Sequence, residues 1–208
     1  MSRRSPPQGL PAALLTALAG GAIILLLQSV PALLPALEYR RAALAAEPWR
    51  LLTGHFVHVN WTHALVNAGA WPVLAWLFAP RLDARRQLMS LALGGLFISL
   101  ALAAWYPSIA WYRGASGALH ALFFAGATAA ADAALRERSR RAVLIPAALL
   151  AGGWIKVALE HPGGDATPYA GWLAATTVPQ AHLFGAIAGT ALGLGFAARA
   201  PRGPTLSL

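Results

Sequence analysis

Apolar residues recur along this chain in six long runs, separated by short stretches that carry charged residues, glycine and proline. The runs cover Leu10–Leu34 (interrupted by Gln28 and Pro31), Asn60–Ala79, Leu88–Ala104, Gly114–Leu135, Ala142–Leu159 and Ala181–Ala198. Each is close to the roughly 20 residues that a helix needs to cross the hydrocarbon core of a membrane. None alternates between apolar and polar positions as a barrel strand does. The pattern therefore predicts an all-α membrane protein, a bundle of six transmembrane helices.

The bundle is expected to occupy residues 10–199, between an N-terminal tail of residues 1–9 and a C-terminal tail of residues 200–208. A cleavable signal peptide is the alternative interpretation of the first apolar run. That run continues from Leu10 past Val30, which is longer than the apolar core of about 7 to 15 residues in a signal peptide. We therefore expect a retained first helix.

The composition agrees with a membrane protein, because 58% of the residues are hydrophobic and only 11% are charged. Soluble domains carry about 25% charged residues. Cysteine is absent, which excludes disulfides and thiolate metal sites. The net charge of +9 would suggest a nucleic-acid partner in a soluble protein. Here the basic residues lie between apolar segments, so we expect contact with the lipid bilayer and no nucleic acid.

The basic residues also predict the orientation of the helices. Six alternating helices put eleven of the sixteen on one side: Arg3, Arg4, Arg81, Arg85, Arg86, Arg136, Arg138, Arg140, Arg141, Arg199 and Arg202. Because cytoplasmic loops are enriched in lysine and arginine, both termini are expected in the cytoplasm. The two longest connections, residues 38–59 and 161–180, then lie on the outer side.

Four polar residues near the starts of helices are candidates for chemistry, because polar side chains inside a membrane are costly and usually functional. His63 and Asn67 lie near the start of the second predicted helix, Ser116 near that of the fourth, and His182 near that of the sixth. These three helices all run from the outer to the inner side. Their first turns must therefore lie at a similar depth, where the four side chains can converge.

Small residues predict that the helices bearing Ser116 and His182 pack closely. The fourth helix carries Gly117, Ala121 and Ala125 at every fourth position, and the sixth carries Gly185, Gly189 and Gly193. Such faces let two membrane helices approach almost backbone to backbone. The hydroxyl and the imidazole can then come within hydrogen-bonding distance, as an activated nucleophile requires. The alternative is a capping serine and an interior histidine beside ordinary helix packing.

His63 and Asn67 are four residues apart and share one helix face. An imidazole N–H and an amide NH₂, together with the Ser116 backbone N–H, are suitable donors for an oxyanion. A structural hydrogen-bond pair between helices is the alternative interpretation. His55 and His58 with His63 resemble a metal cluster, but their spacing does not fit one helix face, and we expect no metal and no other cofactor. His120, one turn after Ser116, is expected to pack against or support the site.

Two charged residues lie near the end of the fifth predicted helix. Lys156 and Glu160 are spaced as an ion pair along a helix, and recognition of a substrate tail is the alternative interpretation. Asp165 could serve as a third member of a catalytic triad, although nothing in the sequence brings it near His182.

Taken in order, these motifs resemble the rhomboid family of intramembrane serine proteases. The matching pieces are Trp49-Arg50, His58, His63 with Asn67, the Gly114-to-Gly117 motif (GASG), and Ala181-His182 followed by Gly185 and Gly189. The resemblance implies Ser116 and His182 as a catalytic dyad without a third carboxylate. It implies His63 and Asn67 as oxyanion donors, with Gly114, Gly117, His58 and His120 in supporting roles.

Three stretches are similar to the rhombosortase subfamily: residues 50–63 (RLLTGHFVHVNWTH), 116–120 (SGALH) and 153–160 (GWIKVALE). This resemblance implies membrane-anchored protein substrates that end in Gly-Gly, an apolar helix and a basic tail. It also implies a bacterial inner membrane, with the active site opening to the periplasm. Transfer to an amine instead of water, a noncatalytic rhomboid-like protein that binds transmembrane helices, and a transporter are the alternatives.

Overall fold

The computed structural model describes residues 9–160 and 178–199. The long helices are α1 (Leu10–Gln28), α4 (Trp61–Phe78), α5 (Ala84–Trp105), α6 (Ser116–Arg136), α7 (Arg140–Glu160) and α9 (Pro179–Ala198). Short elements are η1 (Pro31–Leu33), α2 (Leu34–Leu37), β1 (Tyr39–Arg40), η2 (Arg41–Ala43), α3 (Arg50–Thr53) and β2 (Trp111–Tyr112). The predicted tails, apart from Gly9, and Asp165 lie outside the described residues.

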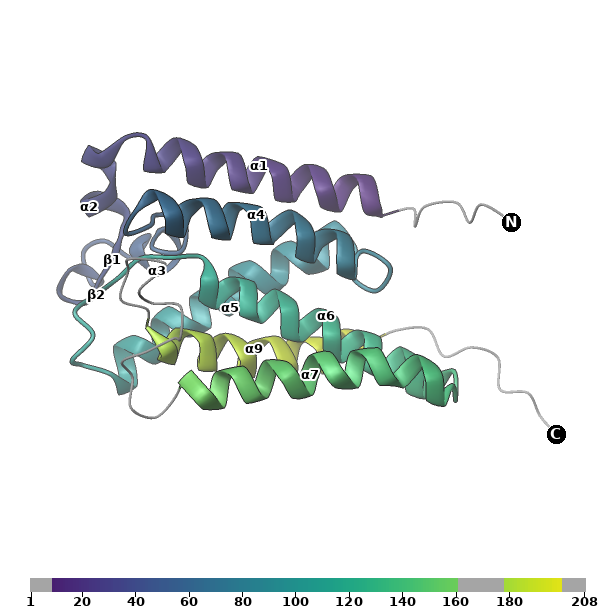
Figure 1. The fold of residues 1–208 in the computed structure, drawn as a ribbon. Helices are drawn as coiled ribbons and strands as arrows, with labels where there is room; N and C mark the ends of the chain where they lie inside the picture. Colours follow the sequence, from purple (N-terminus) through teal and green to yellow (C-terminus); the bar gives the residue numbers. More distant parts are fainter. Residues whose placement is uncertain (1–8, 161–177, 200–208) are drawn as a thin grey trace.

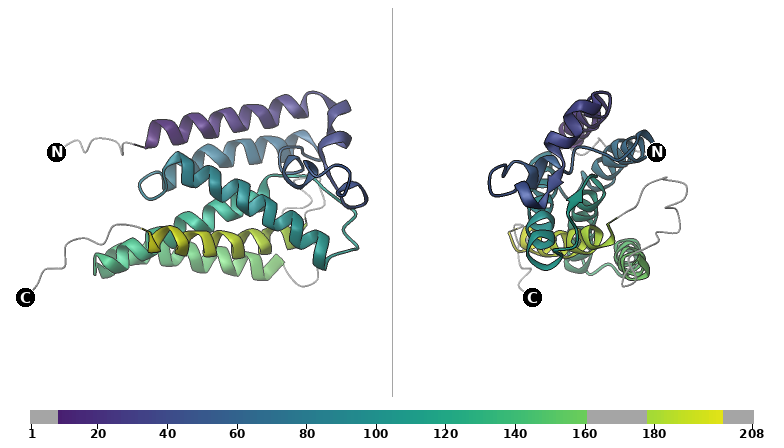
Figure 2. Two further views of the ribbon diagram at one scale, coloured as in Figure 1. Left: turned by 180° about the vertical axis from the view of Figure 1, so that it is seen from behind. Right: turned by 90° about the vertical axis from the view of Figure 1, so that its left-hand side faces the viewer.

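The long helices run up and down in one bundle, with α1 and α7 on opposite sides of it (Figures 1 and 2). Helices α4, α6 and α9 all begin at one end of the bundle, which we call the site end, and α5 and α7 run the other way (Figure 1). Many large apolar side chains face outward, among them Leu144, Ile145 and Leu159 of α7. These features confirm the all-α membrane class.

Five of the described helices, α1, α5, α6, α7 and α9, are long and apolar enough to cross a membrane. Helix α4 has 18 residues and runs beside α1 (Figure 1), but it carries the polar residues His63 and Asn67 and is not among the five. The count of six spans therefore stays a prediction. The chain is a multi-pass membrane protein in either case.

The helix of the first predicted run ends at Gln28, the first of the two residues that interrupt the apolar pattern. Helix α1 stops at Gln28, and the chain turns through η1 and α2 instead of continuing the helix to Leu34. Pro31 explains the break, since proline lacks the N–H that a helix interior needs and disfavours helical backbone at the preceding residue. The other five helices begin and end within four residues of the predicted runs.

Close packing of α6 on α9 forms the centre of the bundle. A Cβ at Gly185 would lie 2.2 Å from the carbonyl oxygen of Gly117, and one at Gly189 would lie 2.3 Å from that of Ala121. At Gly193 it would meet the Ala125 carbonyl oxygen at 2.8 Å. Only glycine permits these distances, so the predicted small faces and their contact are confirmed.

The connection between α1 and α4 packs over the site end and is held by Arg50. This arginine is buried and donates to the backbone carbonyl oxygens of Pro35 and Glu38, each at 2.8 Å. The Glu38 carboxylate in turn accepts from Arg113 at 2.7 Å. Strands β1 and β2 form a two-residue antiparallel pair, which joins this connection to the segment before α6. No strand was expected; this pair lies between helices and leaves the fold class unchanged.

Candidate active site

A sharp turn delivers Ser116 as the first residue of α6. Gly114, just before it, has φ +139°, a conformation that favours glycine. The turn is held by three hydrogen bonds: Gly114 N–H to the Gly54 carbonyl at 3.0 Å, Tyr112 hydroxyl to the Gly114 carbonyl at 2.5 Å, and Ala115 N–H to His58 Nε2 at 3.2 Å. Gly114 thus forms the turn before Ser116, and His58 holds it from the preceding connection.

The side chains of Ser116 and His182 are in contact. Ser116 Oγ lies 2.9 Å from Nε2 of His182, which is on the first turn of α9 and buried. The glycines explain this contact, because a Cβ at Gly117 would lie 2.9 Å from the carbonyl oxygen of Ala181. Larger residues here would push α9 away from the serine. The sequence-based expectation of a hydroxyl–imidazole contact between these helices agrees with this geometry.

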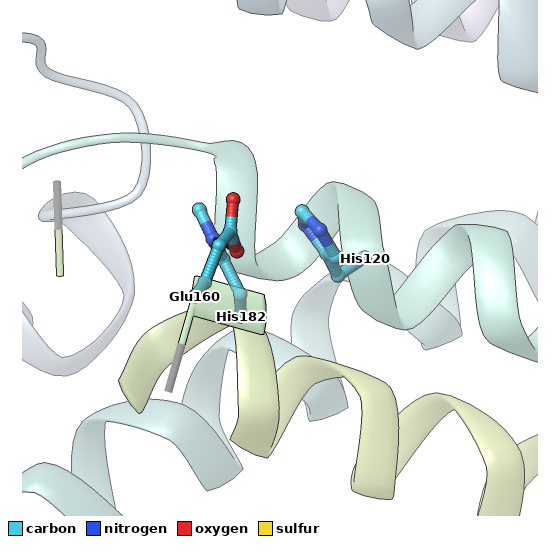
Figure 3. A group of neighbouring side chains, drawn as sticks. All are labelled: His120, Glu160 and His182. Carbon is cyan, nitrogen blue, oxygen red and sulfur yellow. Dashed lines mark hydrogen bonds and ion pairs between the residues drawn. The ribbon is translucent and has the colours of Figure 1, made fainter. Parts of the chain in front are cut away.

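A carboxylate stands behind the imidazole of His182. Glu160, at the end of α7, places Oε2 2.8 Å from His182 Nδ1, and both side chains are drawn in Figure 3. The expectation of a serine–histidine pair with no third carboxylate is therefore wrong in this respect. The sequence predicted for Glu160 a pair with Lys156 or a role in recognising a substrate tail, but not a contact with His182. That ion pair is confirmed at 2.7 Å between Lys156 Nζ and Glu160 Oε1.

His120 lies against the same group. Its ring stacks on that of His182 with centroids 4.3 Å apart and planes 14° from parallel, and Figure 3 shows it beside the Glu160–His182 pair. Its Nδ1 lies 2.7 Å from the Ser116 carbonyl oxygen, and its Nε2 lies 3.1 Å from Lys156 Nζ. The expected packing or supporting role of His120 agrees with these contacts.

His63 and Asn67 line the same cavity as Ser116, on the facing side of α4. The Asn67 side-chain amide donates to the His63 carbonyl oxygen at 2.9 Å, and the His63 ring lies over Gly114. Among the described residues, Nδ1 of His63 is buried and has no hydrogen-bond partner. Both residues therefore lie on the wall of the cavity beside the serine.

His55, His58 and His63 do not form a three-ligand group. His55 contacts the Gly95 carbonyl oxygen at 2.9 Å and the Ser99 hydroxyl at 3.1 Å. The His58 ring packs on the His63 ring with centroids 4.9 Å apart, and it also supports the turn before Ser116. Burial lowers the pKa of His55 to about 4, which keeps it neutral. Among the described residues, the ligand-type atoms that converge, within 4.8 Å, belong to His120, Glu160 and His182.

A cavity of about 480 Å³ lies beside the serine, and residues of α4, α6, α7 and α9 line it. Its wall is mainly apolar, formed by side chains such as Val66, Leu119 and Leu149. Its polar part is formed by the residues described above: His63, Asn67, Ser116, His120, Lys156 and His182. The cavity can therefore hold an apolar peptide segment against the nucleophile.

The contact of Glu160 with His182 is the feature of the site that the sequence did not predict. An ionisable residue inside a predicted membrane helix is a functional candidate by default, and that signal was present for both Lys156 and Glu160. The sequence does not reveal how close the end of α7 lies to the start of α9, and this distance decides whether Glu160 reaches His182.

Comparison with known families gives one match. A family profile described as Rhomboid domain matches residues 45–199. This range contains α4 to α9 and every residue of the site. No curated protein matches the sequence.

Proposed function

Since this chain belongs to the rhomboid family of intramembrane serine proteases, we propose that it is an intramembrane endopeptidase with Ser116 as nucleophile and His182 as general base. The observation that carries the proposal is the 2.9 Å contact between Ser116 Oγ and His182 Nε2. A hydroxyl is a weak nucleophile until a neighbouring base takes its proton, and this distance allows direct transfer.

In the first half of the reaction, Ser116 Oγ attacks the carbonyl carbon of a substrate peptide bond while its proton moves to His182 Nε2. The carbonyl oxygen becomes an oxyanion. Ser116 begins α6, so its N–H points out of the helix without an intrahelical acceptor and carries the positive end of the helix dipole. We propose that this N–H, His63 and Asn67 hold the oxyanion.

Collapse of the tetrahedral intermediate breaks the carbon–nitrogen bond, and His182 gives its proton to the leaving amine. The acyl-enzyme remains on Ser116 Oγ. In the second half, His182 takes a proton from a water molecule as its oxygen attacks the acyl carbon. The acyl–oxygen bond then breaks, the proton returns to Ser116, and the new carboxylate leaves.

The apolar cavity supports a substrate whose cleavage site adjoins a membrane helix. Residues on its wall from α4 and α7, such as Ala70 and Ala148, suit an apolar segment that enters from the bilayer. We further propose that the substrate is a protein that ends in Gly-Gly, an apolar helix and a basic tail. It rests on the similarity of residues 50–63, 116–120 and 153–160 to the rhombosortase subfamily.

The orientation is also a proposal. Eight of the eleven basic residues that predict a cytoplasmic side fall at the turns opposite the site end: Arg81, Arg85, Arg86, Arg136, Arg138, Arg140, Arg141 and Arg199. By the positive-inside rule the site end then faces outward. We propose a bacterial inner membrane, with cytoplasmic tails at residues 1–9 and 200–208 and a membrane domain at 10–199 whose site opens to the periplasm.

The test is cleavage of a membrane-anchored reporter ending in Gly-Gly, an apolar helix and a basic tail. Wild type and Ser116→Ala are reconstituted separately in liposomes, with a second reporter in which Leu-Leu replaces Gly-Gly. Wild type is expected to cleave the first reporter and Ser116→Ala to cleave neither. Equal cleavage by the two proteins would refute the assignment of Ser116. Cleavage of both reporters by wild type would keep the protease and reject the proposed substrate class. Mass analysis of the product separates a free carboxylate from transfer to an amine.

A further inference from the structure

We propose that Glu160 is a positioning residue that fixes the tautomer and orientation of His182, with Lys156 and His120 completing a closed polar ring around the serine. This inference rests on the proposed function, because it assigns the third member of the same site. It starts from the bond between Glu160 Oε2 and His182 Nδ1, at 2.8 Å.

The burial of Glu160 indicates a specific role. Its side chain is only 2% exposed, yet both carboxylate oxygens are bonded, Oε2 to His182 and Oε1 to Lys156 Nζ. A buried carboxylate is costly unless it is paired and hydrogen-bonded, and here it is both. As an ionised carboxylate it only accepts hydrogen bonds, so His182 Nδ1 must carry the hydrogen.

That assignment leaves Nε2 of His182 with its lone pair facing Ser116 Oγ. A neutral imidazole can carry its hydrogen on either nitrogen, and only one tautomer can accept the serine proton. The carboxylate therefore selects the reactive tautomer before substrate arrives. When His182 becomes an imidazolium during the reaction, the same carboxylate lies against the new positive charge.

The second half of the ring is assigned in the same way. Lys156 Nζ can only donate, so His120 Nε2, at 3.1 Å, must accept. His120 Nδ1 then carries the hydrogen and donates to the Ser116 carbonyl oxygen at 2.7 Å. The His120 ring also stacks on the His182 ring. His182 is thus fixed at its edge by Glu160 and on its face by His120.

A bound metal ion is the competing interpretation of this cluster, since ligand-type atoms of His120, Glu160 and His182 lie within 4.8 Å of one another. Lys156 Nζ already contacts Glu160 at 2.7 Å and His120 at 3.1 Å. The ammonium thus supplies the positive charge that a metal ion would bring. We therefore assign the charge balance to Lys156, and the experiment below includes a chelator to separate the two interpretations.

The test measures the reaction of Ser116 with a small fluorophosphonate, in which Oγ attacks phosphorus, fluoride leaves, and His182 takes the proton. The variants are Glu160→Gln, Glu160→Asp and Lys156→Met. The matched control is Glu137→Gln, because Glu137 also pairs with a basic side chain but is 55% exposed at the opposite end of the bundle. Saturation kinetics, measured with and without a chelator, give the maximal labelling rate and the half-saturating concentration. Thermal unfolding in detergent checks the fold.

Glu160→Gln is expected to lower the maximal labelling rate by about 100- to 10,000-fold, as loss of a base or its orienting carboxylate does. Its half-saturating concentration should stay within about threefold, since an orienting group adds no ground-state binding. Glu160→Asp, which keeps the charge, should recover part of the rate. Lys156→Met should fall between wild type and Glu160→Gln, and Glu137→Gln should match wild type.

A folded Glu160→Gln that is labelled as fast as wild type overturns this inference, as does a wild-type rate that the chelator abolishes. If no Glu160 variant folds, Lys156→Met decides, and a folded Lys156→Met with a wild-type rate rejects the ring. Failure of the proposed function looks different, because then wild type itself is not labelled at Ser116.

Discussion

Replacing Gly185 with alanine tests how the small faces of α6 and α9 hold the reactive pair together. The added Cβ would lie 2.2 Å from the Gly117 carbonyl oxygen, whereas ordinary van der Waals contact begins at 3.4 Å. The helices must therefore separate by about 1 Å, because both contacting groups belong to helix backbone. The same movement would lengthen the 2.9 Å contact between Ser116 and His182 to about 4 Å, beyond hydrogen-bonding distance.

We expect this separation to reduce fluorophosphonate labelling of Ser116 by about 100-fold, the effect of a misplacement of about 1 Å. The overpacking should also lower the free energy of unfolding by about 1–3 kcal/mol. The matched control is Gly69→Ala on α4, where an added Cβ meets nothing within 4 Å; it should behave as wild type. A folded Gly185→Ala that is labelled at the wild-type rate would show that close helix packing does not set the geometry of the pair.

Three further predictions follow from other parts of the structure. Gly152→Phe should raise the KM for the reporter protein roughly tenfold, the effect of losing about 1.4 kcal/mol of binding, because Gly152 lines the apolar cavity; an unchanged KM would reject that cavity as the substrate site. Arg50→Met should lower the free energy of unfolding by about 3 kcal/mol, because hydrogen bonds from this charged group to two backbone carbonyl oxygens at 2.8 Å are lost; an unchanged melting temperature in detergent would contradict this role. Burial lowers the pKa of His55 from 6.5 to about 4 in the fold. Between these pH values the unfolded chain binds a proton at His55 that the folded chain does not. The free energy of unfolding should therefore fall by about 3 kcal/mol as the pH drops from 6.5 to about 4. His55→Gln should flatten that decline, and a decline as steep as in wild type would refute the assignment.

The helices and the nucleophile–base pair were predictable because their signals are local or repeated. Apolar runs of membrane-spanning length predict the helices, and glycine at every fourth position of α9 predicts its close packing on α6. Alternation of the helices then brings the first turns of α4, α6 and α9 to one end. The contact between Ser116 and His182 follows from these features together.

The partner of His182 Nδ1 was not predictable in the same way. Lys156 and Glu160 lie four residues apart on α7, which predicts their ion pair. The sequence says nothing of the distance from the end of α7 to the start of α9. The first apolar run also continues to Leu34, although the helix ends at Gln28 and Pro31 prevents its continuation. Apolar composition indicates which segments can lie in the membrane, but it does not show where a helix ends. The missing N–H of proline does.

The central claim is that His182 activates the hydroxyl of Ser116 across the α6–α9 contact. The most direct measurement is peptide mapping by mass spectrometry after fluorophosphonate treatment of wild type and His182→Ala in the same lipid. One phosphonate adduct is expected in wild type, on Ser116, and it should be lost in a folded His182→Ala. An adduct on a different serine, or equal modification of Ser116 in both proteins, would contradict activation of Ser116 by His182.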